Sequence, residues 1–236
     1  MTERRYGEVT SEAISQLSRS ADPFRAESER AYLKSTRDFL GVNVPACRTV
    51  ARALTSQGWA SDRDALCRCV EELWDGPYFE CRRVAVMLLV LNAQQLDPAN
   101  SVDRTLVARL IRSGETWAIV DDLAVHVAGS MFDRSPLDMA SELDAWSNDD
   151  SSFWLRRASM LALLGGLRRG GGDWDRFVRY SVPMLSEKEF FIRKSIGWIL
   201  REVSKKRPEL VVDYLAEFGD RCSGLTLREA SKYLVT

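Results

Sequence analysis

The chain has 236 residues, of which 45% are hydrophobic and 28% are charged, and its net charge is −1. This length is enough for one domain with a substantial core, and no apolar stretch reaches the ~18 residues that a membrane-spanning helix needs. The first residues, Met1 to Glu8, are polar and are not followed by the apolar core of a signal peptide. We therefore expect a cytoplasmic protein that does not interact with membranes.

The chain has five cysteines and a single histidine, His126. Cys67 and Cys69 are two residues apart, so on a helix they point about 200° apart and cannot share a metal ion. The remaining cysteines are scattered along the chain without metal-ligand spacing: Cys47, Cys81 and Cys222. We expect no metal and no other cofactor, and we interpret the cysteines as small buried side chains in a reducing compartment.

The hydrophobic pattern is helical along the whole chain. Apolar residues recur at spacings of three and four, as in Val84, Met87 and Leu88, and alternating strand-like runs are nearly absent. The breaks between helices contain proline or glycine, in chain order Gly41 to Pro45, Gly76-Pro77, Pro136, Gly170 to Gly172, Pro208 and Gly224. The pattern predicts an all-α fold of about a dozen helices, most of them roughly 10–18 residues long. No segment is typical of a linker, so residues 1–236 are expected to form a single domain.

A weak internal repeat runs through this helical pattern. Arg83, Arg157, Lys194 and Glu229 occupy equivalent places in similar short segments, and the successive spacings are 74, 37 and 35 residues. Because 74 is twice 37, one further unit is expected near residue 120. Repeats made of two helices stack into a solenoid whose curvature leaves a concave surface. We therefore expect HEAT-like helical repeats in a curved solenoid.

Charge is distributed unevenly along the chain. Residues 101–150 contain 4 basic and 10 acidic residues, a net charge of −6, whereas residues 151–208 contain 13 basic and 5 acidic residues, a net charge of +8. A basic block in a nearly neutral protein predicts a one-sided positive surface, here the concave face of the solenoid. Solvated helix faces would explain the same block, and charge alone does not choose between these interpretations.

Three segments place aromatic and charged residues at similar positions in successive repeats. Trp117 and Asp121 are four residues apart, one helical turn, so they share a face. Arg157 follows in the next repeat and Trp198 in the one after it, whereas Trp154 is interpreted as a core residue. Each residue alone is more often structural. Together, on stacked repeats, they could hold a flat cationic ligand beside a phosphate.

These segments resemble the AlkD-type DNA alkylation repair glycosylases, a HEAT-like family. The resemblance rests on Trp117-x-x-x-Asp121, on Trp154-Leu155-x-Arg157-Ala158 and on segments 188–202 and 225–230, and it is looser in the N-terminal half. It implies hydrolysis of the N-glycosidic bond of cationic alkylated purines, such as 3-methyladenine and 7-methylguanine, in duplex DNA. This reaction would serve base excision repair and would leave the lesion in the stack instead of flipping it out. We expect the protein to act as a monomer.

By matching position, the resemblance makes Asp121 the catalytic carboxylate, and Trp117 and Trp198 the aromatic walls beside the deoxyribose of the lesion. It makes Arg157 a contact to a backbone phosphate, and Tyr32 and Arg201 further DNA contacts. The residue types suit the chemistry, because a cationic purine is already an activated leaving group and needs no strong general acid. A carboxylate stabilises the oxocarbenium-like sugar that remains and can orient water.

The chain departs from the family pattern in one place. Ala118-Ile119 stands where members often have a polar or acidic residue. Asp122 lies about 100° round the helix from Asp121 and is not expected to replace it. The alternative interpretation is a non-catalytic helical-repeat module that binds DNA or a protein partner, and the presence of Asp121 favours the enzyme.

Overall fold

The computed structural model describes residues 7–234, and these residues form helices joined by short loops, without a β-strand. One isolated bridge, between Asp38 and Tyr78, is the β-type pairing within this range. The expectation of an all-α fold is confirmed. The same range holds fifteen α-helices, more than expected, because some long helical stretches are divided into short pieces. In this part of the chain no helix combines the length and the apolar character that crossing a membrane requires.

The chain forms two compact units, an N-terminal unit that ends at Leu96 and a C-terminal unit that begins at Asp97. The helices of the N-terminal unit are α1 (Glu8–Ser18), α2 (Pro23–Leu33), α3 (Val44–Ser56), α4 (Arg63–Trp74), α5 (Phe79–Leu91) and η1 (Ala93–Gln95). Those of the C-terminal unit are α6 (Ser101–Arg112), α7 (Trp117–Asp122), η2 (Leu123–Ala128), α8 (Gly129–Arg134), α9 (Pro136–Ser147), α10 (Phe153–Leu161), α11 (Leu164–Arg168), α12 (Trp174–Met184), α13 (Phe190–Ser204), α14 (Pro208–Phe218), η3 (Gly219–Arg221), α15 (Gly224–Ala230) and η4 (Ser231–Tyr233). That both units act as a single domain stays a prediction.

The core of the N-terminal unit surrounds α5, against which α3 and α4 pack. Every residue of α5 from Phe79 to Leu89 is buried, including charged ones. The carboxylate of Glu80 accepts hydrogen bonds from the backbone N–H groups of Leu40, Gly41 and Val42, at 3.0, 2.8 and 3.0 Å. A buried charge needs such partners. Glu80 therefore fixes the loop that leads into α3.

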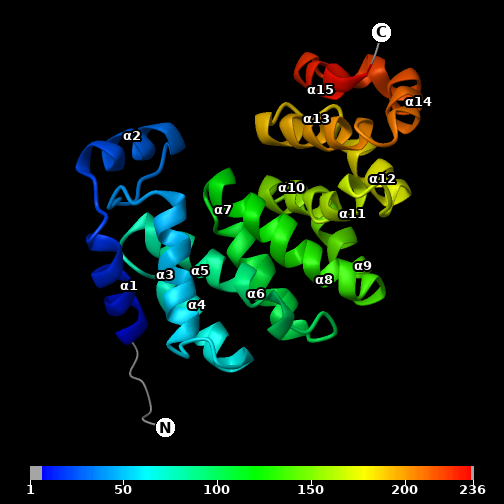
Figure 1. The fold of residues 1–236 in the computed structure, drawn as a ribbon. Helices are drawn as coiled ribbons and strands as arrows, with labels where there is room; N and C mark the ends of the chain where they lie inside the picture. Colours follow the sequence, from blue (N-terminus) through cyan, green and yellow to red (C-terminus); the bar gives the residue numbers. More distant parts are fainter. Residues whose placement is uncertain (1–6, 235–236) are drawn as a thin grey trace. The chain divides into compact units, whose positions relative to one another are not determined.

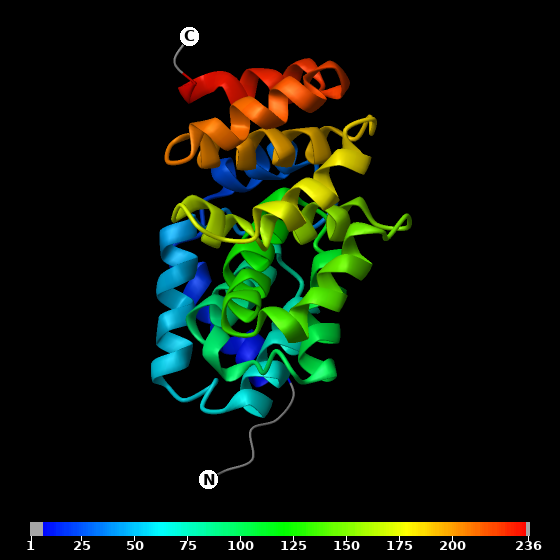
Figure 2. The same ribbon diagram turned by 90° about the vertical axis from the view of Figure 1, so that its right-hand side faces the viewer.

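Successive repeats stack in the C-terminal unit. Helix α10 packs against both α7 and α13, and α13 packs against α15, so that α13 lies between α10 and α15 (Figure 1, Figure 2). These helices contain three of the repeat positions, Arg157, Lys194 and Glu229, and α7 occupies the place near residue 120 where a further unit was expected. The expected stacking of helical repeats is confirmed here. The curvature of the stack stays a prediction.

The helix that begins at Trp117 changes its winding in the middle. Segments α7, η2 and α8 follow one another without a break, and η2 is a π-helix in which the N–H of Gly129 donates to the carbonyl of Ala124, five residues back. Such π-helical turns are rare and occur often at functional sites. A Cβ at Gly129 would lie 2.9 Å from the carbonyl oxygen of Ala162, so glycine allows this helix to approach the end of α10 closely.

Candidate active site

Asp121 and Arg157 form the centre of the candidate site. Asp121 lies in the last turn of α7 and Arg157 in the second turn of α10. Arg157 donates from Nε to Oδ1 and from Nη2 to Oδ2 of Asp121, both at 2.8 Å, which is the paired geometry that a guanidinium fork gives with a carboxylate. The side chain of Arg157 is 3% exposed and that of Asp121 is 16% exposed. The carboxylate is therefore held in one orientation and is still accessible.

The remaining terminal nitrogen of Arg157 links the pair to the next repeat. Nη1 donates to the backbone carbonyl of Phe191, and the guanidinium carbon lies 6.0 Å from the centre of the Phe191 ring. One guanidinium thus connects α7, α10 and α13. The sequence did not identify this role of Phe191, because a backbone carbonyl has no side-chain signature, although Phe191 lies within the segment that carries the resemblance.

Each of the three site helices begins just before its site residues. Thr116 caps α7 by accepting from the N–H of Ala118 at 3.1 Å, Ser152 caps α10, and Glu189 caps α13 by accepting from the N–H of Phe191 at 3.1 Å. Side-chain caps satisfy the N–H groups that a first helical turn leaves without partners. The local sequence therefore determines where these helices start, and with that the position of each site residue along its helix.

The two tryptophans predicted as aromatic walls lie on the helices that flank α10. Trp117 is the first residue of α7, one turn before Asp121, and is 37% exposed. Trp198 lies in the middle of α13 and is half-buried. Trp154 is buried and packs on Phe191 with ring centres 4.9 Å apart, which confirms it as a core residue. The function of Trp117 and Trp198 stays a prediction.

The predicted DNA contacts have different surroundings. Tyr32 is exposed on α2 of the N-terminal unit. Arg201 pairs with Glu229 of α15, which also accepts from Lys194. The hydrogen bond from Lys194 and the charge of Arg201 lower the pKa of Glu229. Arg157 is almost buried and directs three of its nitrogens to protein groups, so only its remaining N–H bonds could reach a phosphate.

Asp122 is not part of this centre. Its Oδ1 lies 4.0 Å from Nε2 of His126, one turn further along the helix, and both side chains are about half exposed. That Asp122 does not replace Asp121 stays a prediction. Within residues 7–234 no three histidine, cysteine, aspartate or glutamate side chains are grouped as metal ligands would be.

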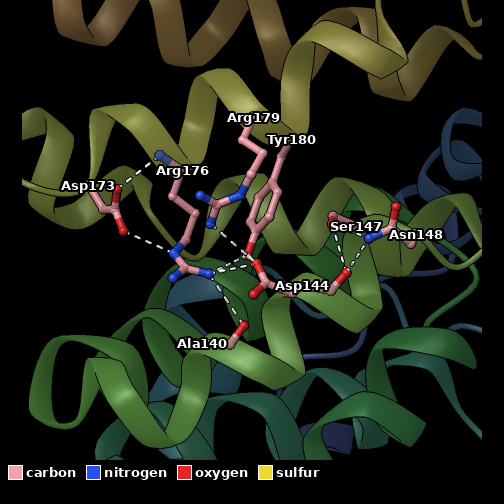
Figure 3. A network of polar contacts seen from close by, with 8 residues as sticks. All are labelled: Ala140, Asp144, Ser147, Asn148, Asp173, Arg176, Arg179 and Tyr180. Carbon is pink, nitrogen blue, oxygen red and sulfur yellow. Dashed lines mark hydrogen bonds and ion pairs between the residues drawn. The ribbon is translucent and has the colours of Figure 1, made fainter.

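Acidic residues of segment 101–150 pair with basic residues of segment 151–208. The pairs are Asp121–Arg157, Asp133–Arg169 and Asp144–Arg176, separated by 36, 36 and 32 residues. Figure 3 shows the third pair, in which Arg176, Arg179 and Tyr180 of α12 converge on Asp144 of α9. Part of the charge that the sequence places in two opposite blocks is thus neutralised between neighbouring repeats. The one-sided positive surface stays a prediction for the other basic residues.

Comparisons with known proteins agree with this architecture. Residues 13–234 match a family model described as DNA alkylation repair enzyme. A solved structure from Enterococcus faecalis, described as a predicted DNA alkylation repair enzyme, is 24% identical with a TM-score of 0.81, and the alignment covers 92% of this chain and 98% of that chain. A solved structure of smu.31 from Streptococcus mutans is 17% identical with a TM-score of 0.62, covering 90% and 98%.

At these identities the two structures show a shared fold, and among curated proteins none matches. The family model, in contrast, spans nearly the whole chain, including α7, α10 and α13 with the Asp121–Arg157 pair. The chain therefore belongs to the DNA alkylation repair enzyme family.

Proposed function

We propose that this protein is a DNA glycosylase that hydrolyses the N-glycosidic bond of cationic alkylated purines, such as 3-methyladenine and 7-methylguanine, in duplex DNA. It would act in base excision repair without a metal and without flipping the lesion out of the stack. The observation that carries the proposal is the Asp121 carboxylate, which Arg157 orients and which lies one turn from the partly exposed Trp117.

The reaction requires a fixed negative charge near the sugar more than it requires a general acid. When the bond from the sugar to a cationic purine breaks, the purine leaves as a neutral base and the sugar becomes cationic. A preorganised carboxylate beside that carbon stabilises the developing charge and can orient the attacking water. Because both oxygens of Asp121 are held by Arg157, little reorganisation would be required during the reaction.

The aromatic and basic residues would supply binding. The rings of Trp117 and Trp198 would lie against the deoxyribose of the lesion, where an indole face attracts positive charge by about 0.5–2 kcal/mol. Arg157, Arg201 and Tyr32 would contact the DNA backbone, which carries no sequence information but positions the duplex. Such binding weakens as salt increases because bound counterions are released from DNA.

A non-catalytic helical-repeat module is the second candidate, and one observation favours it. Paired carboxylates also link neighbouring repeats where no site is expected, as in Asp133–Arg169. A purely structural Asp121–Arg157 pair would have the same spacing of 36 residues. The two candidates differ in what happens when each carboxylate is neutralised.

The test compares the wild type with Asp121→Asn and the matched control Asp133→Asn, which removes a pair of the same spacing. Release of methylated purines from methylated duplex DNA is measured with enzyme in excess and no added metal, and folding is checked by circular dichroism. We expect wild type and Asp133→Asn to release base at similar rates and Asp121→Asn to be slower by about 10²-fold or more.

Equal rates for wild type and Asp121→Asn would remove Asp121 from the catalytic role. No release by any of the three proteins, with DNA binding retained, would identify the non-catalytic module. DNA affinity that stays the same from low to high salt would contradict the backbone contacts.

A further inference from the structure

Arg156 is the neighbour of Arg157, and like Arg157 it donates hydrogen bonds from all three side-chain nitrogens. The carboxylate that it binds, however, follows it in the chain, whereas the carboxylate that Arg157 binds precedes it. Its Nε and Nη2 donate to Oε1 and Oε2 of Glu187 at 3.0 and 2.9 Å, and its Nη1 donates to the backbone carbonyl of Asp149 at 2.6 Å. The Arg156 side chain is 15% exposed. Arg157 reaches back by 36 residues to Asp121, whereas Arg156 reaches forward by 31 residues to Glu187.

Glu187 lies in the loop that connects α12 to α13, and this loop is held from two sides. Its carboxylate binds Arg156 of α10, and its backbone carbonyl accepts from Nε of Arg193 of α13 at 2.7 Å. The position of the loop relative to α10 is therefore set by the Arg156 fork. Two parallel donor–acceptor pairs with a common planar group restrict orientation as well as distance.

The same loop leads directly into the part of α13 that touches the candidate site. Glu189 caps the helix, and Phe191, two residues later, accepts from Arg157 through its carbonyl. The Phe191 ring stacks on Phe153 of α10 with centres 6.2 Å apart and an angle of 5° between the rings. A shift of the loop would move this carbonyl, and Arg157 would lose one of its three hydrogen bonds.

We propose that Arg156 is a positioning residue for the repair reaction, and this inference rests on the function proposed above. By fixing Glu187 it sets the start of α13, the carbonyl of Phe191 then orients Arg157, and Arg157 orients the carboxylate of Asp121. The hydrogen bonds of the Arg156 side chain described above go to Glu187 and Asp149, and not to Asp121 or Trp117.

The chain contains a matched control in Arg176. Its side chain is 14% exposed, and it links α12 to α9 through Asp144 at 2.7 Å while also binding Asp173 at 2.9 Å (Figure 3). Arg176 forms at least as many bonds as Arg156, so its loss should cost as much stability. Its partners in Figure 3 include no residue of the candidate site.

The experiment compares wild type, Arg156→Gln, Glu187→Gln, the double variant Arg156→Gln/Glu187→Gln and Arg176→Gln. Base release is measured in single turnover at saturating enzyme, DNA affinity is measured separately, and the NMR signal of the Arg157 Nε–H is followed in the free protein. We expect Arg156→Gln and Glu187→Gln to slow release by about tenfold with affinity nearly unchanged, and to shift or broaden the Arg157 signal. The double variant should be no worse than either single one, because the same link is removed. Arg176→Gln should retain both the rate and the signal.

A wild-type rate in Arg156→Gln, or an unchanged Arg157 signal, would overturn the proposal even if stability falls. Equal loss in Arg156→Gln and Arg176→Gln would overturn it too, since general destabilisation would then explain both. If the wild type releases no base, the proposed glycosylase function fails, and the NMR signal alone decides whether Arg156 orients the Asp121–Arg157 pair.

Discussion

The two units use arginines at equivalent repeat positions in different ways. Arg83 on α5 and Arg157 on α10 are 74 residues apart, and each binds one carboxylate and one backbone carbonyl. In the N-terminal unit, Nη1 of Arg83 makes both contacts, to Glu29 at 3.4 Å and to the carbonyl of Val42 at 3.3 Å. Both contacts are longer than a typical N–H···O hydrogen bond, and Arg83 binds one oxygen of the Glu29 carboxylate instead of two.

In the C-terminal unit the geometry is tighter, because two nitrogens of Arg157 bind the two oxygens of Asp121 at 2.8 Å. The well-held carboxylate of the N-terminal unit is a different residue, Glu80, whose oxygens are occupied by backbone N–H groups. The repeat therefore supplies a buried arginine in both units, but it presents an oriented, accessible carboxylate in the C-terminal unit. Both units have a buried arginine at this repeat position. What distinguishes the candidate site from a structural link is how the carboxylate partner of the arginine is held.

The largest expected effect concerns the carboxylate that only anchors a loop. Glu80→Ala would leave three N–H groups without partners, two of them buried, at about 1–3 kcal/mol each, so the free energy of unfolding should fall by about 4 kcal/mol or more. Urea denaturation followed by circular dichroism measures this loss, with the exposed Glu27→Ala as control. A loss below about 1 kcal/mol would contradict the structural role assigned to Glu80.

Alanine substitutions at two glycines, one in each unit, compare how closely the backbone is packed in the two units. Gly41 has a φ of +76°, and a Cβ there would lie 2.0 Å from the carbonyl oxygen of Asp22, so Gly41→Ala should cost about 3 kcal/mol. Gly197 is helical, and its Cβ would lie 2.8 Å from the Cβ of Glu229. Gly197→Ala gains helix propensity and should cost about 1 kcal/mol. Thermal unfolding of both variants measures the two stability losses. A larger loss for Gly197→Ala than for Gly41→Ala would show that α13 and α15 cannot move apart to make room for the added Cβ.

Replacing each equivalent arginine by lysine tests whether the bidentate geometry matters for activity. Arg157→Lys keeps a positive charge but cannot bind both oxygens of Asp121, so single-turnover base release should fall by about tenfold or more. Arg83→Lys should leave the rate as in wild type, because the hydrogen bonds of Arg83 to described residues, at Glu29 and Val42, lie within its own unit. Equal rates for the two variants would mean that the orientation of Asp121 does not limit the reaction.

The smallest effect is a pH dependence at Glu229, a carboxylate that cationic side chains hold. Its pKa is lowered from 4.5 by Lys194 and Arg201, so the ionised form stabilises the fold above pH 4.5. This stability is lost as the pH falls through the lowered pKa. Glu229→Gln should therefore be less stable than wild type by about 1 kcal/mol at pH 7, and this difference should shrink as the pH falls below 4.5. A difference that does not change with pH would indicate lost packing instead of lost charge.

Much of the candidate site was within reach of the sequence. The repeat spacing placed one unit near residue 120, and Asp121 and Arg157 are one repeat apart, so a contact between them follows from the stacking of repeats. Helical periodicity and the proline and glycine breaks between helices predicted the fold class. The resemblance identified the same residues independently of this geometry.

The rest depends on information that residue types do not carry. The acceptor at Phe191 is a backbone carbonyl, and the Arg83–Glu29 contact spans 54 residues, which is no multiple of the repeat. The charge of a segment is also an incomplete guide to the surface, because composition does not show which side chains face the neighbouring repeat. Asp133 and Arg169 count in opposite blocks of the sequence and pair in the structure.

The π-helical turn between Asp121 and Gly129 has a consequence for how this segment can evolve. A π-helical turn holds a residue more than an α-helical one, and each residue of an α-helix turns the chain by about 100°. Asp121 is bound to Arg157 on one side of the turn, and Gly129 lies against Ala162 on the other. Because the extra residue of a π-helical turn can be removed to give an α-helical turn, relatives that keep both contacts could be one residue shorter in this segment, and their alignments should place a one-residue gap here instead of elsewhere in the helix.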